Sequence, residues 1–203
     1  MQTILQVSAS LFGDSSQSSR LGTEFVAALR SLPGATHGTV LINRDLASQP
    51  VPHLTAERFQ AFNTPVEQRT LEQQRVVAES DALIEELKRA NVIVIGLPMY
   101  NFGIPSTLKA YFDHVARAGV TFRYTAEGPE GLLKGKKAYV FATRGGRYAG
   151  TPADLQAAYV RQFLGFIGIH DVEFVYAEGL AMGAEERDAA LRKAGARIEQ
   201  LAA

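Results

Sequence analysis

Three segments of this sequence place hydrogen-bonding, aromatic or glycine residues directly after a short apolar run. Residues 8–19 are rich in serine, residues 98–106 contain two aromatic side chains and an asparagine, and residues 143–148 contain a glycine pair. Each apolar run has the length of a buried strand, and ligands of open α/β sheets bind beyond the carboxyl ends of the strands. The sequence therefore predicts a ligand site made of three loops, with no strong acid, base or nucleophile among them.

The serine-rich loop has the residues expected of an anion site. The hydroxyls of Ser10, Ser16 and Ser18 can donate hydrogen bonds, and a helix is predicted to begin just after residue 19. The first N–H groups of a helix are unpaired and carry a partial positive charge, which attracts phosphate. Serine is also a common N-cap, so capping alone is the alternative. The density of serines favours anion binding.

Two motifs that the chain lacks narrow the kind of anion. Lys137 stands where a Walker loop around Gly135-Lys136 needs serine or threonine, and no GxGxxG dinucleotide fingerprint occurs. A mononucleotide monophosphate, such as that of flavin mononucleotide (FMN), therefore suits the serine-rich loop.

The second loop suits a flat ring with polar edges, such as the isoalloxazine of FMN. Met99, Tyr100 and Phe102 can pack on such a ring, and Asn101 offers both a donor and an acceptor. Backbone N–H groups of residues 101–103 could bind the ring nitrogen N5. For any one of these residues, a loop of buried aromatic side chains without a ligand is the alternative.

The third loop offers backbone donors. Thr143, Arg144, Gly145 and Gly146 stand at and after the end of a predicted strand. Glycine allows close approach of the backbone to a ligand. The glycine N–H groups could bind the N1/O2 edge of a flavin, which gains negative charge on reduction. Arg144 could instead be a surface charge.

Composition excludes several functions. The chain has 203 residues, with 21 Lys and Arg against 21 Asp and Glu, so it offers no basic field for nucleic acid or an anionic membrane. It has no cysteine, and His37, His53, His114 and His170 are too widely spaced for a local metal motif. The apolar runs are too short for a signal peptide or a membrane span, so a cytoplasmic location is expected.

Apolar periodicity predicts strands that alternate with helices. Short apolar runs predict five strands, at residues 4–7, 38–43, 92–97, 137–143 and 170–177. Spacings of three and four predict a helix that ends at Pro33-Gly34, and further helices at 65–90, 106–117, 152–167 and around 191–201. Residues 46–54 are predicted as a loop, and residues 119–135 as a turn-rich excursion.

This alternation predicts an α/β fold with a parallel sheet covered by helices on both faces. The flavodoxin-like strand order 2-1-3-4-5 fits five strands, and its ligand crevice lies between the first and third strands. Two of the three loops follow those strands. No repeat or linker divides the chain, so residues 1–203 are expected to form a single flavodoxin-like FMN-binding domain.

With these residues the chain resembles the FMN-dependent NADH-azoreductases, within the flavodoxin-like NAD(P)H:quinone oxidoreductase group. The resemblance covers nearly the whole chain, and its most specific parts are residues 98–102, 116–125, 128–131, 143–146 and 163–169. It implies that the FMN phosphate is bound by Ser10, Ser16, Gln17 and Ser18. It also implies that the isoalloxazine contacts Met99, Tyr100, Asn101 and Phe102, and that its pyrimidine edge is held by Thr143, Arg144, Gly145 and Gly146.

The resemblance further implies an activity. NADH or NADPH would reduce FMN and leave, and a quinone or azo acceptor would then take hydride from FMN N5 in a ping-pong reaction. An azo bond needs two such cycles to give two amines. A homodimer with active sites at its interface is implied as well, in which Phe122 and Tyr124 would line the substrate pocket. Because the flavin carries the reaction, no catalytic side chain is required.

Two other functions are left open. A non-catalytic FMN or electron-carrier protein would share the three loops, although the aromatic residues and the excursion at 119–135 favour a substrate site. Gly13-Asp14-Ser15 is similar to the nucleophile turn of GDS-type serine esterases. Those enzymes need a late Asp-x-x-His to activate the serine, and neither His114 nor His170 has that aspartate.

Overall fold

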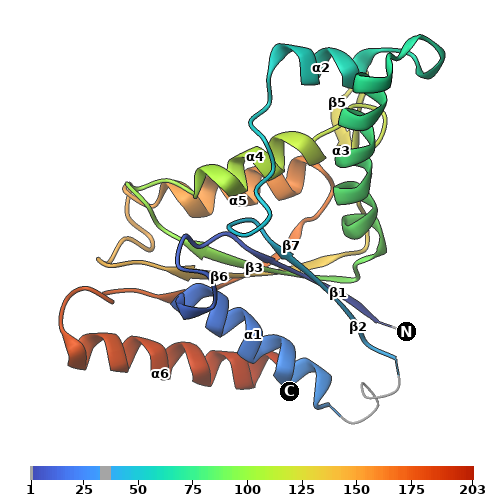
Figure 1. Cartoon of the computed structure of the whole chain (residues 1–203). Coiled ribbons are helices and arrows are strands. Elements are labelled where there is room, and N and C mark those ends of the chain that lie inside the picture. Colours follow the sequence, from blue (N-terminus) through green and yellow to red (C-terminus); the bar gives the residue numbers. More distant parts are fainter. Residues whose placement is uncertain (1, 33–37) are drawn as a thin grey trace.

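The computed structural model describes residues 2–32 and 38–203. A parallel sheet of five strands runs through the middle of the molecule (Figure 1). The strand order is β2-β1-β3-β6-β7. These strands are β1 (Thr3–Ser8), β2 (Val40–Asp45), β3 (Val92–Pro98), β6 (Lys137–Thr143) and β7 (Asp171–Ala177). Because β4 and β5 lie outside this sheet, its strands follow the chain order 2-1-3-4-5, and the predicted flavodoxin-like order is confirmed.

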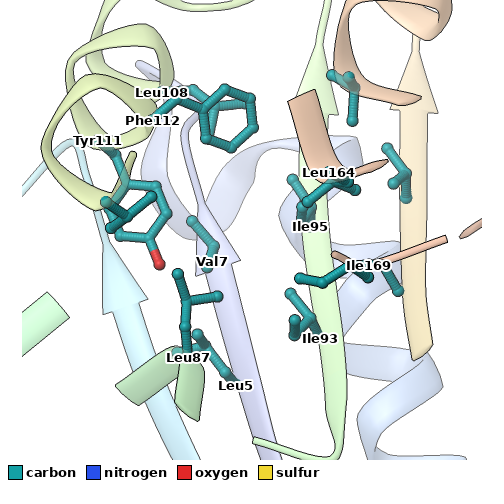
Figure 2. Packing of buried hydrophobic residues seen from close by; sticks show 14 of the residues in the cluster. Leu5, Val7, Leu87, Ile93, Ile95, Leu108, Tyr111, Phe112, Leu164 and Ile169 are labelled. Atoms are coloured by element: carbon teal, nitrogen blue, oxygen red, sulfur yellow. The ribbon is translucent and has the colours of Figure 1, made fainter. Parts of the chain in front are cut away.

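Helices cover both faces of the sheet (Figure 1). One face carries α1 (Gln17–Arg30) and α6 (Ala184–Leu201), and the other carries α3 (Leu71–Arg89), α4 (Ser106–Val115) and α5 (Leu155–Phe166). Successive residues of a strand point to opposite faces, so each helix layer has its own hydrophobic cluster. Figure 2 shows the cluster under α3, α4 and α5, where Val7 and Ile95 of the strands face Phe112 and Leu164 of the helices.

The predicted excursion at residues 119–135 contains a β-hairpin. Its strands β4 (Phe122–Thr125) and β5 (Gly128–Gly131) are antiparallel. A side chain at Gly131 would overlap the backbone of Gly168, so the hairpin packs closely against the turn that follows α5. The hairpin follows the carboxyl end of α4, whereas the loop after β3 precedes the amino end of that helix (Figure 1).

The predicted helix at 65–90 is wrong at its start. The helix α3 begins at Leu71, because Thr70 and Gln73 form a capping box. Residues Val66–Gln68 make a separate 3-10 turn, η2. A further helix that was not predicted, α2 (Ala56–Asn63), precedes this turn.

The first helix also begins earlier than predicted. Gln17 and Ser18 belong to the first turn of α1, and a short 3-10 turn, η1 (Gly13–Ser15), precedes them. The strand β2 lies two residues later than predicted. The predicted end of the helix at Pro33-Gly34 lies outside the described residues. In the part of the chain that the structure describes, no helix is long and apolar enough to cross a membrane.

Candidate functional site

Serine hydroxyls gather at the N-terminus of α1. Ser10, Ser16 and Ser18 are buried, and the hydroxyls of Ser16 and Ser18 are hydrogen-bonded to each other at 2.9 Å. Ser16 is the N-cap residue, yet its side chain makes no capping hydrogen bond, so the capping alternative is wrong for this residue. The N–H groups of residues 17–19 have no acceptor in residues 2–32 and 38–203. The start of α1 therefore offers unpaired donors to an anion.

A glycine in β3 lets this helix start approach the sheet. A Cβ at Gly96 would lie 3.3 Å from the carbonyl carbon and oxygen of Ser18 and 3.5 Å from the nitrogen of Ser19. The sequence analysis did not single out Gly96. A glycine inside an otherwise apolar strand is the signal that could have identified it, because such a residue often marks close backbone approach.

The loop after β3 makes a tight reverse turn. Tyr100 and Gly103 exchange two backbone hydrogen bonds of 3.2 and 3.0 Å. Asn101 and Phe102 lie between them with φ of 50° and 64°, as in a type I′ turn. A positive φ is rare for an aromatic residue, and such strain is concentrated at functional sites. Within the described residues the N–H groups of Asn101 and Phe102 have no acceptor, whereas that of Gly103 is used inside the turn.

Arg144 is completely buried, so the alternative that it is a surface charge is wrong. Its guanidinium donates to Asp154 at 2.6 Å and to Glu178 at 3.1 Å, and it lies 5.0 Å from the ring centroid of Tyr176. Asp154 is the N-cap of α5, and Glu178 directly follows β7. The side chain of Arg144 therefore fixes the loop in place, and its Nε is buried without a partner among the described residues.

The glycine pair follows this anchor. The carboxylate of Glu178 also accepts the N–H groups of Tyr148 and Ala149, at 2.8 and 2.9 Å, so both ends of the loop are held. The N–H groups of Gly145 and Gly146 have no acceptor anywhere in the described chain. The loop after β6 thus presents two backbone donors from a restrained backbone.

Direct contacts bring the three predicted loops together. The hydroxyl of Tyr100 lies 3.1 Å from that of Ser10 and accepts the N–H of Leu11 at 3.2 Å. The N–H of Met99 donates to the carbonyl of Thr143 at 3.0 Å. The loops after β1, β3 and β6 therefore form one continuous surface at the carboxyl edge of the sheet.

The ring of Phe102 lies at the outer side of this surface. It is 52% exposed, and it meets the ring of Tyr148 edge-on, with 5.7 Å between the centroids. The contact joins the second and third loops by aromatic side chains as well as by backbone hydrogen bonds. Tyr148 was not among the predicted site residues.

Within one chain, neither Phe122 nor Tyr124 joins the three loops. Phe122 is buried against Phe166, with 4.3 Å between the ring centroids, and Tyr124 is 75% exposed on the hairpin. The hairpin follows the far end of α4, and a helix of ten residues is about 15 Å long. The length of α4 therefore separates these two residues from the loop after β3.

His114 and His170 lie outside the three loops, whereas His53 lines a groove together with Asn101, Phe102 and Gly103. His114 is buried with its Nδ1 atom 2.9 Å from the carbonyl of Ala110, and burial lowers its pKa. His53 and His170 are exposed, and His37 lies outside the described residues. The prediction of a packing or surface histidine is confirmed for His53, His114 and His170.

Ser15 lacks the environment of an esterase nucleophile. Its hydroxyl donates to the carbonyl of Phe12 at 2.7 Å. None of the described histidines is hydrogen-bonded to it. Among the described residues, the serine therefore has no histidine base to activate it.

Three residues that hold the loops from behind were missed by the sequence analysis. Asp154 and Glu178 bind Arg144, and Gln156 donates to the carbonyls of Pro98 and Gly103. Only Asp154 had a local signal, since aspartate is a preferred N-cap at the start of a helix. Glu178 and Gln156 bind groups that lie 29 to 58 positions away in the chain, so no local pattern reveals them.

Comparison with known proteins assigns the class. A family model described as a flavodoxin-like fold matches residues 2–202, and the chain belongs to this family. It is 54% identical to the FMN-dependent NADH:quinone oxidoreductase of Cellvibrio japonicus over 200 aligned residues, and the alignment covers 98% of both chains. It is 55% identical to the FMN-dependent NADH:quinone oxidoreductase 6 of Burkholderia lata over 198 aligned residues, and the alignment covers 97% of both chains.

A solved structure with the same fold carries the flavin. The FMN-dependent NADH-azoreductase from Bacillus anthracis, in complex with FMN, superposes with a TM-score of 0.87 at 28% identity, over 100% of both chains. An azoreductase from another strain of Bacillus anthracis superposes with a TM-score of 0.89 at 27% identity. Both likenesses extend over the whole chain, including the three loops of the site.

Proposed function

We propose that this protein is an FMN-dependent NAD(P)H oxidoreductase that reduces quinones and azo compounds. The proposal is carried by one observation. Three groups of backbone N–H donors that lack acceptors in the described chain meet at one edge of the sheet, at residues 17–19, 101–102 and 145–146. The names of relatives that are 54% and 55% identical, FMN-dependent NADH:quinone oxidoreductases, agree with this interpretation.

In this proposal the FMN phosphate binds at the start of α1. The N–H groups of residues 17–19 and the hydroxyls of Ser10, Ser16 and Ser18 are its donors, with Gln17 beside them. The hydroxyl of Ser19 is buried without a partner among the described residues and is a further donor. The helix N-terminus supplies a partial positive charge, so the site needs no lysine or arginine.

The ring of FMN then lies against the second and third loops. Met99, Tyr100 and Phe102 cover it, and the N–H groups of residues 101–102 and 145–146 bind its polar edges. When bound, FMN would supply two-electron redox chemistry between a nicotinamide and an acceptor. The chain itself orients the ring, and the restrained donors of the glycine pair stabilise negative charge at the pyrimidine edge.

A second subunit completes the substrate pocket in this proposal. Tyr124 is 75% exposed on a hairpin that follows the carboxyl end of α4, so we expect it to line the pocket of another copy. Phe122 supports Tyr124 from below, with 5.5 Å between the two ring centroids. We propose that the protein is a cytoplasmic homodimer, and that residues 1–203 of each copy form a single FMN-binding domain.

Two measurements test the function. Titration with FMN, followed by quenching of flavin fluorescence, should show saturable binding with one FMN per chain. Oxidation of NADH and of NADPH, measured with a quinone and with an azo dye, should then proceed by ping-pong kinetics. A protein that binds FMN without turnover would be an electron carrier, and a protein that does not bind FMN would overturn the proposal.

A further inference from the structure

Gln156 lies directly behind the turn at Tyr100–Gly103. It is in the first turn of α5 and is 1% exposed. Its Nε2 atom donates to the carbonyl of Pro98 at 2.9 Å and to the carbonyl of Gly103 at 2.7 Å. Because both partners are carbonyl oxygens, only the amino end of the amide can face them. One side chain thus joins the last residue of β3 to the last residue of the turn.

The backbone of this turn needs such support. Asn101 and Phe102 hold positive φ angles, and a bulky residue keeps that conformation only when its surroundings determine it strongly. The backbone hydrogen bonds between Tyr100 and Gly103 close the turn. The two bonds from Gln156 fix the closed turn relative to the sheet, and with it the unpaired N–H groups at its tip.

The same turn of α5 holds the loop after β6. Asp154, the N-cap, accepts from Arg144 at 2.6 Å and from the N–H of Ala157 at 3.1 Å. The start of α5 is therefore a common anchor for the second and third loops. The relative position of their N–H donors is set by these side chains.

Gln156 is not explained by packing alone. Its Oε1 atom is buried with no partner in the described chain, and an unsatisfied buried acceptor is destabilising. A leucine would fill similar space without that cost. A glutamine at this position is accounted for by its two donated hydrogen bonds.

We propose that Gln156 is a positioning residue for the flavin ring, which holds the Asn101 and Phe102 N–H groups where the ring edge binds. The inference rests on the proposed function. It concerns the ring and not the phosphate, because both hydrogen bonds donated by Gln156 go to the end of β3 and the turn after it.

The first test compares two ligands in the full-length protein. Riboflavin has the ring of FMN without its phosphate. We expect Gln156→Leu to weaken riboflavin and FMN binding by the same factor, about tenfold for two lost hydrogen bonds. Val160→Ala is the matched control, since it opens a cavity in the buried face of the same helix and removes no side-chain hydrogen bond. Unchanged riboflavin affinity in Gln156→Leu, or an equal loss in Val160→Ala, would overturn the inference.

A second variant separates positioning from shape. Glutamate at position 156 can donate to a carbonyl only when it is protonated, and burial beside carbonyl oxygens raises its pKa. Riboflavin binding to Gln156→Glu should therefore tighten as the pH falls from about 8 to about 6. The groove beside Gln156 is lined by the ionisable residues Lys109, Tyr159 and His53, and the ion pair between Arg144 and Asp154 lies next to it. Because these groups are also present in Gln156→Leu, that variant is the control for their titration.

The outcomes distinguish the two proposals. Binding to Gln156→Glu that is independent of pH, or that follows the profile of Gln156→Leu, would show that the side chain only fills space. Wild-type protein that binds neither flavin would overturn the proposed function and this inference together. Wild-type protein that binds both flavins, with Gln156→Leu equal to it, would overturn the inference alone.

Discussion

Replacing Ser16 and Ser18 by alanine, singly and together, tests the phosphate site. Their hydroxyls are hydrogen-bonded to each other at 2.9 Å, so each single variant leaves one hydroxyl without its partner. Loss of one partner of a buried hydrogen bond costs about 1–3 kcal/mol, whereas loss of both partners is nearly neutral. The start of α1 faces the ligand crevice, where water can reach the hydroxyl that has lost its partner. We therefore expect the lower end of this range, about 1 kcal/mol of lost unfolding free energy, in each single variant. The double variant should be close to wild type.

The affinity for FMN should rank the variants differently from the unfolding free energy, with the single variants closer to wild type than the double variant. Each hydroxyl lost from a charged phosphate should cost about 1.5–3 kcal/mol, or about 13- to 160-fold in Kd. The double variant should bind FMN most weakly, although by less than the sum, because contacting residues are not additive. Riboflavin should bind equally to wild type and to all three variants, since it has no phosphate.

Urea unfolding of the FMN-free protein gives the unfolding free energies, and quenching of flavin fluorescence gives the Kd values. Ser31→Ala is the matched control, because this exposed serine lies at the other end of α1, where its hydroxyl donates to the carbonyl of Ala27. A double variant with wild-type FMN affinity would refute the reasoning. Equal losses for riboflavin and FMN would refute it as well, because the serines would then act on the whole site.

Three further predictions concern the turn, the hairpin and the buried histidine. The Phe102→Gly variant should have an unfolding free energy about 1 kcal/mol higher than that of Phe102→Ala. Both variants lose the ring, and only glycine adopts φ of 64° without strain. Urea unfolding that ranks the alanine variant higher would argue against the left-handed turn. Gly131→Ala should lose about 3 kcal/mol, because its Cβ would overlap the backbone of Gly168, and a wild-type Tm would contradict this packing. Burial lowers the pKa of His114, so the unfolded chain binds more protons and stability should fall as the pH drops below about 6.5. Tm measured against pH should fall less steeply in His114→Gln, and an unchanged slope would exclude this histidine as the cause.

The arrangement of the sheet could be predicted because it depends on local patterns. The run from Val92 to Leu97 is apolar on both faces, which only a central parallel strand requires, and β3 is buried along its whole length. The helix start after β1 was predicted three residues too late, because serine is favourable both before a helix and in its first turn. The break at Thr70 was missed because the residues on either side of it are good helix formers.

The loops of the candidate site could be predicted as well, but not the roles of all their residues. Arg144 stands beside two glycines in a loop, where arginine is usually exposed. Its burial depends on two acids, Asp154 and Glu178, that come from the starts or ends of other elements. No pattern within the loop contains this information.

The sequence alone determined where the candidate site lies, because strand ends, serine-rich helix starts and glycine pairs are local features with fixed consequences for the backbone. Only the tertiary structure decided how that chemistry is held. Gln156 meets Gly103 across 53 residues, and the hairpin with Tyr124 is carried to the far end of α4, away from the loops of its own chain. Such contacts form only when distant elements pack together, since their geometry follows from the whole set of buried surfaces rather than from any one segment.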